Sequence, residues 1–389
     1  LMLYWRVEVA ALLNLPVHLI KWLLGMAYLT IIFSIFTQLM VATKKSKKLG
    51  TVQVIWHYGR FALTVIGLIY WTDTWYTTTD GAQSSYTYMG KIVGEFVGTL
   101  LIAGYAFWQI IPYMSFKALR WRYIQYALRF GIPLIPFALS NYILTSFDQW
   151  YILSKIGEAE TGQNAFAYKI ALLYVGLGSA LIDGANPSYY EYMKKKEYGK
   201  VRQQIDSMSK LLVLGGGLLM LLAVDAGTLL SSNKALVNAL PLAPVIIAAY
   251  LFHGIGSFAN RGIYFRKKNA YLAVIILTSG VVNIVLNGYF IEEYGFQAAA
   301  YTTLASYIFM MILSIIVTTY ILKLPPLPLG RILKYIVLLV AVLWPYYYFG
   351  QPDLGLDPIQ ILIKGGLWLV LGLALFYNKI GLFLRRDAP

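Results

Sequence analysis

Long apolar runs alternate with short polar breaks along the whole chain. Each run has roughly the 20 residues that a helix needs to cross about 30 Å of hydrocarbon. None shows the alternating pattern of about ten residues that is typical of a lipid-spanning strand. Because backbone N–H and C=O groups in lipid must pair within their own segment, the pattern predicts helices. The predicted spans are 19–42, 50–71, 91–113, 130–152, 164–187, 211–231, 241–263, 271–291, 298–322, 332–349 and 359–378.

The polar breaks alternate in charge. Those at 43–49, 114–129, 188–210, 266–268 and 323–334 are rich in Lys and Arg, whereas the breaks between them carry few bases and several Asp or Glu residues. Basic loops stay on the cytoplasmic side of a membrane, so the alternation predicts a cytoplasmic C-terminus and an external start of the given sequence. An extra or missing helix would break this alternation, which therefore supports a count of about eleven spans.

Two of the basic breaks, 114–129 and 188–210, mix their bases with aromatic residues. Such segments are typical of helices that lie on the inner leaflet with Lys and Arg toward acidic head groups. The net charge of +15 would also suit nucleic acid. Because most of the bases lie in the breaks between spans, we expect membrane lipids as partners and no nucleic acid.

The composition fits a membrane protein, since 59% of the residues are hydrophobic and only 13% are charged. Soluble domains average about 45–50% apolar and about 25% charged residues. A soluble protein of this length could not bury so many apolar helices in one core. The chain contains no cysteine, and its three histidines are far apart in sequence. There is no P-loop, GxSxG or HExxH motif. We therefore expect no metal, no cofactor and no enzyme activity, and a transporter is favoured.

Three of the basic residues inside predicted spans are candidates for substrate binding, because charge there is costly and normally faces a cavity or a partner. Arg60 is a candidate phosphate ligand, although it could instead snorkel or pair with Glu95 on the next span. Lys169 either carries charge into a cavity or snorkels outward. Arg261 closes its span in the sequence SFANRGIYF, where it contacts either an anion or lipid head groups.

Acidic residues inside spans are the candidates for ion coupling. Asp148 follows Asn141 by seven residues, which places both on one face of a helix. Asp148 either takes a coupling ion or pairs with Lys155 near the end of the span. Glu95 is the second candidate, with a position at the membrane interface as the alternative.

Polar residues also mark two further places. Asn283 and Asn287 are four residues apart on one helix face, a spacing that predicts hydrogen bonds to a neighbouring helix. Asp183 and Asn186 lie beside Gly184 and Pro187, which predicts a kinked helix end with an Asx turn.

The stretch 126–193 resembles the start of the second half of bacterial oligosaccharide flippases. These form the polysaccharide-biosynthesis branch of the multidrug/oligosaccharidyl-lipid/polysaccharide (MOP) exporter superfamily. The matching elements are LRFGIPLIP, SFDQWYIL, AYKIA and PSYYEYM. LAPVIIAAYLFHGIGSFANRGIYFRKKN and YGFQAAAYTTLASYIF are similar to later helices of the same family. The resemblance covers about residues 120–320.

The resemblance implies an all-α membrane protein with two MATE-like bundles in an inverted V. The fourth predicted span resembles the seventh helix of the family. The sequence as given is therefore expected to lack the first three helices, leaving the N-terminal bundle incomplete. The implied organisation is the rest of the N-terminal bundle in 1–125, the C-terminal bundle in 126–322, and two further transmembrane helices in 323–389.

The resemblance also implies a function. Such a flippase moves an undecaprenyl-pyrophosphate-linked oligosaccharide to the outer leaflet of the bacterial inner membrane by alternating access, for surface polysaccharides such as O-antigen. Bases would neutralise the pyrophosphate, and Trp150, Tyr168 and Tyr174 would stack on sugars. A proton or sodium ion would drive the step, and a polysaccharide polymerase would be a partner. The substrate-binding candidates are Arg60, Lys169, Arg261, Asn141 and Trp150, and the ion-coupling candidates are Asp148 and Glu95.

Three other functions compete with this interpretation. A cation-coupled drug exporter of the same superfamily would carry acidic residues deep in the N-terminal bundle. A membrane glycan polymerase or ligase would need a large outer loop with Arg or His, and the longest one, 72–90, is small and free of bases. A non-transporting scaffold would not need Arg60 and Lys169 inside spans. The flippase accounts best for the sequence.

Overall fold

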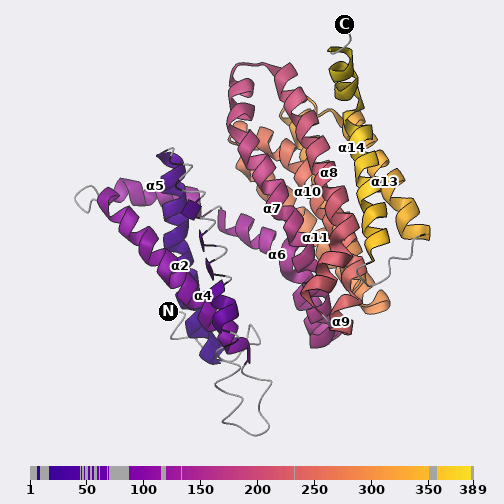
Figure 1. Cartoon of the computed structure of the whole chain (residues 1–389). Coiled ribbons are helices and arrows are strands. Elements are labelled where there is room, and N and C mark those ends of the chain that lie inside the picture. Colours follow the sequence, from indigo (N-terminus) through magenta and orange to yellow (C-terminus); the bar gives the residue numbers. More distant parts are fainter. Residues whose placement is uncertain are drawn as a thin grey trace. The chain divides into compact units, whose positions relative to one another are not determined.

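The structure, a computed structural model, is almost entirely helical in the residues that it describes, and none of them forms a strand (Figure 1). These are 7–8, 17–43, 45, 48, 51–52, 55–56, 59–60, 62–67, 69, 87–114, 120–132, 134–231, 233–349 and 357–386. Within them, nine helices are long and apolar enough to cross a membrane. The helical membrane fold is therefore confirmed. Packing divides the chain into unit 1 (Leu1–Tyr123) and unit 2 (Ile124–Pro389).

Unit 1 is built on the packed pair α2 (Val17–Ala42) and α4 (Thr87–Ile110). Phe33, Phe36 and Met40 of α2 form its core together with Val52 and Ala106. Apolar residues surround α2 on all sides, as expected of a helix that meets lipid as well as protein. Much of the predicted span 50–71 lies outside the described residues.

Helix α5 (Trp121–Gly131) begins at the end of unit 1 and continues into unit 2. It has apolar and polar residues on opposite sides, which agrees with the surface helix predicted for the basic break at 114–129. A short 3-10 turn, η1 (Ile111–Tyr113), ends the preceding helix α4.

Unit 2 is a bundle of long helices joined by short connections (Figure 1). Helix α10 packs against α7, α8 and α12, and α11 packs against α6 and α12. The α13–α14 pair packs against α8. The helices of unit 2 are α6 (Leu134–Lys155), α7 (Glu158–Lys194), α8 (Tyr198–Leu230), α9 (Lys234–Val237), α10 (Ala243–Phe265), α11 (Asn269–Tyr294), α12 (Ala298–Ile316), α13 (Leu329–Phe349) and α14 (Pro358–Arg386), with the short η3 (Leu240–Leu242) and the π-helical η4 (Val317–Ile321).

The basic break 188–210 does not form separate helices on the membrane surface, and that prediction is wrong. Its residues extend α7 and α8, which contain 37 and 33 residues and are joined only by Lys195–Glu197. At 1.5 Å per residue α7 is about 55 Å long, well beyond the hydrocarbon thickness. The extended ends contain Lys, Arg, Glu, Gln and Met residues with good helix propensity, so the helices continue past the apolar segment.

Three helices of unit 2 end on a lysine with positive φ: Lys196 after α7, Lys267 after α10 and Lys323 after η4. After α7 the amide of Glu197 donates to the Tyr192 carbonyl at 2.9 Å, which satisfies a group at the helix end. Positive charge is also favourable beside the last carbonyls of a helix. These lysines define one side of the bundle, here named the basic end.

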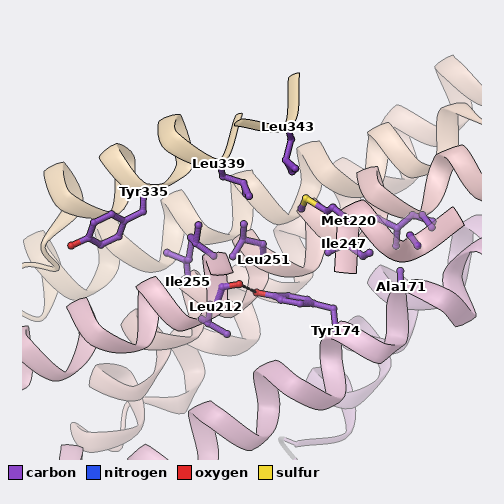
Figure 2. Packing of buried hydrophobic residues seen from close by; sticks show 14 of the residues in the cluster. Ala171, Tyr174, Leu212, Met220, Ile247, Leu251, Ile255, Tyr335, Leu339 and Leu343 are labelled. Carbon is purple, nitrogen blue, oxygen red and sulfur yellow. Dashed lines mark hydrogen bonds between the residues drawn. The ribbon is translucent and has the colours of Figure 1, made fainter. Parts of the chain in front are cut away.

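The core of unit 2 lies where α7, α8, α10 and α13 meet (Figure 2). Tyr174 of α7 is 1% exposed, and its hydroxyl donates to the Leu212 carbonyl of α8 at 3.3 Å. Tyr335, Leu339 and Leu343 of α13 face the same cluster. The last two long helices are thus integrated into unit 2 through shared apolar packing.

Candidate functional site

Arg60 lines a pocket of about 540 Å³ inside unit 1. Its guanidinium carbon lies 5.1 Å from the centre of the Trp56 ring, a cation–π contact. The backbone of Arg60 lies so near Gly98 of α4 that an added Cβ there would be 3.0 Å from its Cα. Lys48 lines the same pocket, and its ammonium donates to Gln109 Oε1 at 2.7 Å. Two cations beside aromatic walls suit an anionic, partly apolar ligand.

Glu95 is partly buried on α4, and its backbone carbonyl accepts a hydrogen bond from the Thr99 hydroxyl at 2.7 Å. Its role in coupling stays a prediction. Asn141 lies on α6, but its side chain is outside the part of the chain that the structure describes.

Asp148 is buried in unit 2, with 2% of its surface exposed. One carboxylate oxygen accepts the amide of Gln149 at 2.9 Å. Among the described residues the other oxygen has no hydrogen-bond partner, and neither has the side-chain amide of buried Asn164 on α7. Asn164 and Tyr168 lie within electrostatic range of the carboxylate but outside hydrogen-bonding geometry. The arrangement leaves a buried carboxylate oxygen available to a proton or a small cation.

Hydroxyl groups from three other helices lie near this carboxylate. Tyr168 Oη and Thr303 Oγ1 of α12 share a hydrogen bond of 2.8 Å. Tyr250 of α10 and Tyr307 of α12 also interact electrostatically with Asp148. Polar residues from α6, α7, α10 and α12 thus converge at one place inside the bundle.

The alternative pairing of Asp148 with Lys155 is wrong. Lys155 instead binds Glu292 of α11, with 3.0 Å between Nζ and Oε1, and Tyr151 Oη donates to the same oxygen at 2.9 Å. This exposed contact joins the ends of α6 and α11.

The predicted hydrogen bonding of the asparagine pair is confirmed. Asn287 donates to Asn283 at 3.1 Å and accepts a hydrogen bond from Thr302 of α12. All three side chains are buried, so the contact fastens α11 to α12.

The aromatic residues expected to stack on sugars separate into two groups. Trp150 is 57% exposed on α6. Tyr168 and Tyr174 are 5% and 1% exposed in the core, so the expectation that they stack on a substrate is wrong. Tyrosine content marks a membrane protein, but it does not indicate which tyrosines pack inward.

Lys169 is exposed on α7, one residue beyond buried Tyr168. Arg261 is 3% exposed on α10, and one of its terminal nitrogens donates to the Ile182 carbonyl of α7. Lys169 and Ile182 are thirteen residues apart, or about 20 Å along the helix. The structure therefore does not gather Lys169 and Arg261 into one cluster.

Arg261 has two ring neighbours: its guanidinium carbon is 5.2 Å from the centre of Phe258 and 5.6 Å from that of Tyr189. Its other two nitrogens are buried without a hydrogen-bond partner among the described residues. The predicted helix end with an Asx turn is wrong, because α7 continues through Pro187 to Lys194. Asn186 instead donates to the side chain of Asp183, at 3.1 Å from Oδ1. Arg261 thus joins α10 to α7 at Ile182 while retaining unused donors.

Sequence reasoning missed a second buried carboxylate. Asp225 of α8 binds Lys364 of α14 through both oxygens, at 2.8 and 2.6 Å from Nζ, and Lys364 is 2% exposed. Each residue is a charge inside a predicted span, and that signal could have identified both.

The backbone arrangement is similar to that of a solved membrane protein, described as lipid II flippase MurJ in an inward closed conformation. The TM-score is 0.55 at 15% sequence identity, and the match covers 76% of this chain. The chain has the MurJ fold. The match spans 64% of the length of that flippase. No protein-family model matches the sequence, and no curated protein does.

Proposed function

We propose that this protein is a flippase that moves a polyprenyl-diphosphate-linked oligosaccharide across the bacterial inner membrane by alternating access. The observation that carries the proposal is the fold, which the chain shares with a flippase of a lipid-linked substrate. A transporter also accounts for a chain that is almost entirely membrane helices, and it requires no enzyme chemistry. A cytoplasmic C-terminus and a polysaccharide polymerase partner complete the proposal.

The pocket of Arg60 and Lys48 is the proposed diphosphate site. A diphosphate needs concentrated positive charge, which a guanidinium provides in a planar, bidentate form. The walls of Trp56 and Tyr105 supply apolar and aromatic surface beside that charge. Arg261 and exposed Lys169 would bind the anion at other stages of its passage, and exposed Trp150 would contact the sugar.

Asp148 is the proposed coupling residue, with a proton or sodium ion as its ligand. A buried carboxylate with an unused oxygen gains stability when it binds either ion. Because α6, α7, α10 and α12 all contribute to its surroundings, ion binding would alter how four helices pack. Coupling requires such a differential effect on two conformations.

A flipping assay tests the function. The chain is reconstituted in vesicles with a fluorescent polyprenyl-diphosphate disaccharide, and the quencher-accessible fraction is followed over time. We expect the Arg60→Gln variant to flip the lipid at least about tenfold more slowly, since it loses a charge-assisted contact. The matched control is Arg202→Gln, which changes an exposed arginine of α8. Equal rates in vesicles with and without protein would refute the flippase.

A further inference from the structure

Helix α10 carries a continuous polar face within a strongly apolar span. Tyr250, His253, Ser257, Asn260 and Tyr264 follow each other at spacings of three, four, three and four residues. This spacing places them along one side of a helix. The five residues are here named the α10 polar face.

The α10 polar face remains accessible after unit 2 has packed. Four of its residues are half-buried, and Tyr264 at the basic end is 46% exposed. The adjoining sides of α10 are covered: a Cβ on Gly254 would meet Leu212 at 3.5 Å, and one on Gly256 would meet the Met311 backbone at 3.2 Å. Polar side chains on an otherwise apolar helix are expected to face a cavity rather than lipid.

The neighbours of the α10 polar face are aromatic and polar as well. His253 lies beside Tyr307 of α12, with 5.0 Å between ring centres. Tyr250 lies within electrostatic range of Asp148, and Tyr190 of α7 within range of Tyr264. The face therefore extends from the Asp148 cluster to the basic end, between α7 and α12.

Hydrogen-bonding capacity is unused along this face. Asn260 has a buried carbonyl oxygen without a partner among the described residues. The Ser257 hydroxyl donates to the Gly254 carbonyl at 2.6 Å, which leaves its oxygen free to accept. Neutral donors and acceptors beside aromatic rings suit sugar hydroxyls and the apolar faces of sugar rings better than they suit a diphosphate, which requires cations.

We infer that the α10 polar face binds the glycan of the transported lipid and distinguishes it from the bare polyprenyl diphosphate. The inference rests on the proposed function and adds a site to it. The diphosphate binds to cations elsewhere, while the sugars pass along Tyr250, His253, Ser257, Asn260 and Tyr264.

The absence of cysteine from the sequence gives a clean test. Ser257→Cys places a near-isosteric thiol on the α10 polar face. Val281→Cys, a 53% exposed position on α11, is the lipid-facing control, and Ala259→Cys, 2% exposed, is the buried control. In vesicles, we expect a membrane-impermeant methanethiosulfonate to modify Ser257→Cys at least about tenfold faster than either control, because thiolates form in water and not in lipid.

Protection of Ser257→Cys from modification by two lipids then tests whether the face binds the sugar. A polyprenyl-diphosphate disaccharide should slow the modification of Ser257→Cys, whereas the same lipid without sugar should slow it much less. Equal protection by both lipids, no protection, or modification no faster than at Val281→Cys would overturn the inference. Quenching of tryptophan fluorescence by each lipid is measured in parallel. If both lipids bind while the inference fails, the proposed function stands; if neither binds, both fall.

Discussion

Asp148 and Asp225 are both buried in membrane helices of unit 2, and their surroundings differ sharply. Both oxygens of Asp225 contact the ammonium of Lys364, at 2.8 and 2.6 Å. One oxygen of Asp148 accepts a hydrogen bond from the backbone amide of Gln149, and the other has no partner among the described residues. A fully paired charge fastens α8 to α14, whereas an incompletely paired one is available to a ligand. Burial alone therefore does not distinguish a paired charge from one that could take a ligand, whereas the hydrogen-bond partners of each oxygen do.

The largest expected effect comes from breaking the completed pair. In Lys364→Met the carboxylate of Asp225 stays buried without a counter-charge, which should lower the free energy of unfolding by about 3–5 kcal/mol. Chemical denaturation of the purified protein in detergent measures this. The double variant Asp225→Leu/Lys364→Met should recover most of the loss, because no lone charge remains. A single variant as stable as the unmodified protein would show that the pair is not structural.

The opposite result is expected at the incompletely paired carboxylate. Asp148→Asn keeps the shape of the side chain and removes its charge, so the free energy of unfolding should change little. The flipping rate driven by an ion gradient should fall at least about tenfold, within the usual range of coupling energies. Asp225→Asn is the matched control and should reduce stability more than the rate per folded molecule. Normal gradient-driven flipping by Asp148→Asn would exclude Asp148 from coupling.

The smallest effect is expected at the exposed pair of Lys155 and Glu292, whose side chains are 51% and 53% exposed. Water and salt screen such a pair, so Lys155→Ala should change the free energy of unfolding far less than Lys364→Met does. Thermal unfolding at low and high salt would measure the difference. A loss as large as that of Lys364→Met would mean that exposure does not set the strength of these pairs.

The number and order of the helices in unit 2 followed from hydropathy and loop charge. Their lengths did not, because hydropathy reports where lipid ends, while the polar continuations of α7 and α8 keep helical hydrogen bonding in water. The deep burial of Tyr168 and Tyr174 depends on which side of α7 meets the bundle, and the tyrosines themselves carry no such signal.

The candidate site was predictable only in part. Asp148, Arg60 and Arg261 were identifiable because each places charge inside an apolar span. The partner of Arg261 was not predictable, since its contact with the Ile182 carbonyl joins residues far apart in sequence. The residues of the α10 polar face recur every three or four positions, so this face could have been found in the sequence.

The extended α7–α8 hairpin has a mechanical consequence. Its tip at Lys195–Glu197 is the end of a helix about 55 Å long, and the residues beside it, Met193 and Val201, pack in the core of unit 2. A rigid rod of this length is a lever arm, so a small tilt of its base sweeps the tip through a much larger arc. Because the chain contains no cysteine, a spin label on the single cysteine of Lys195→Cys would report conformational changes of the hairpin.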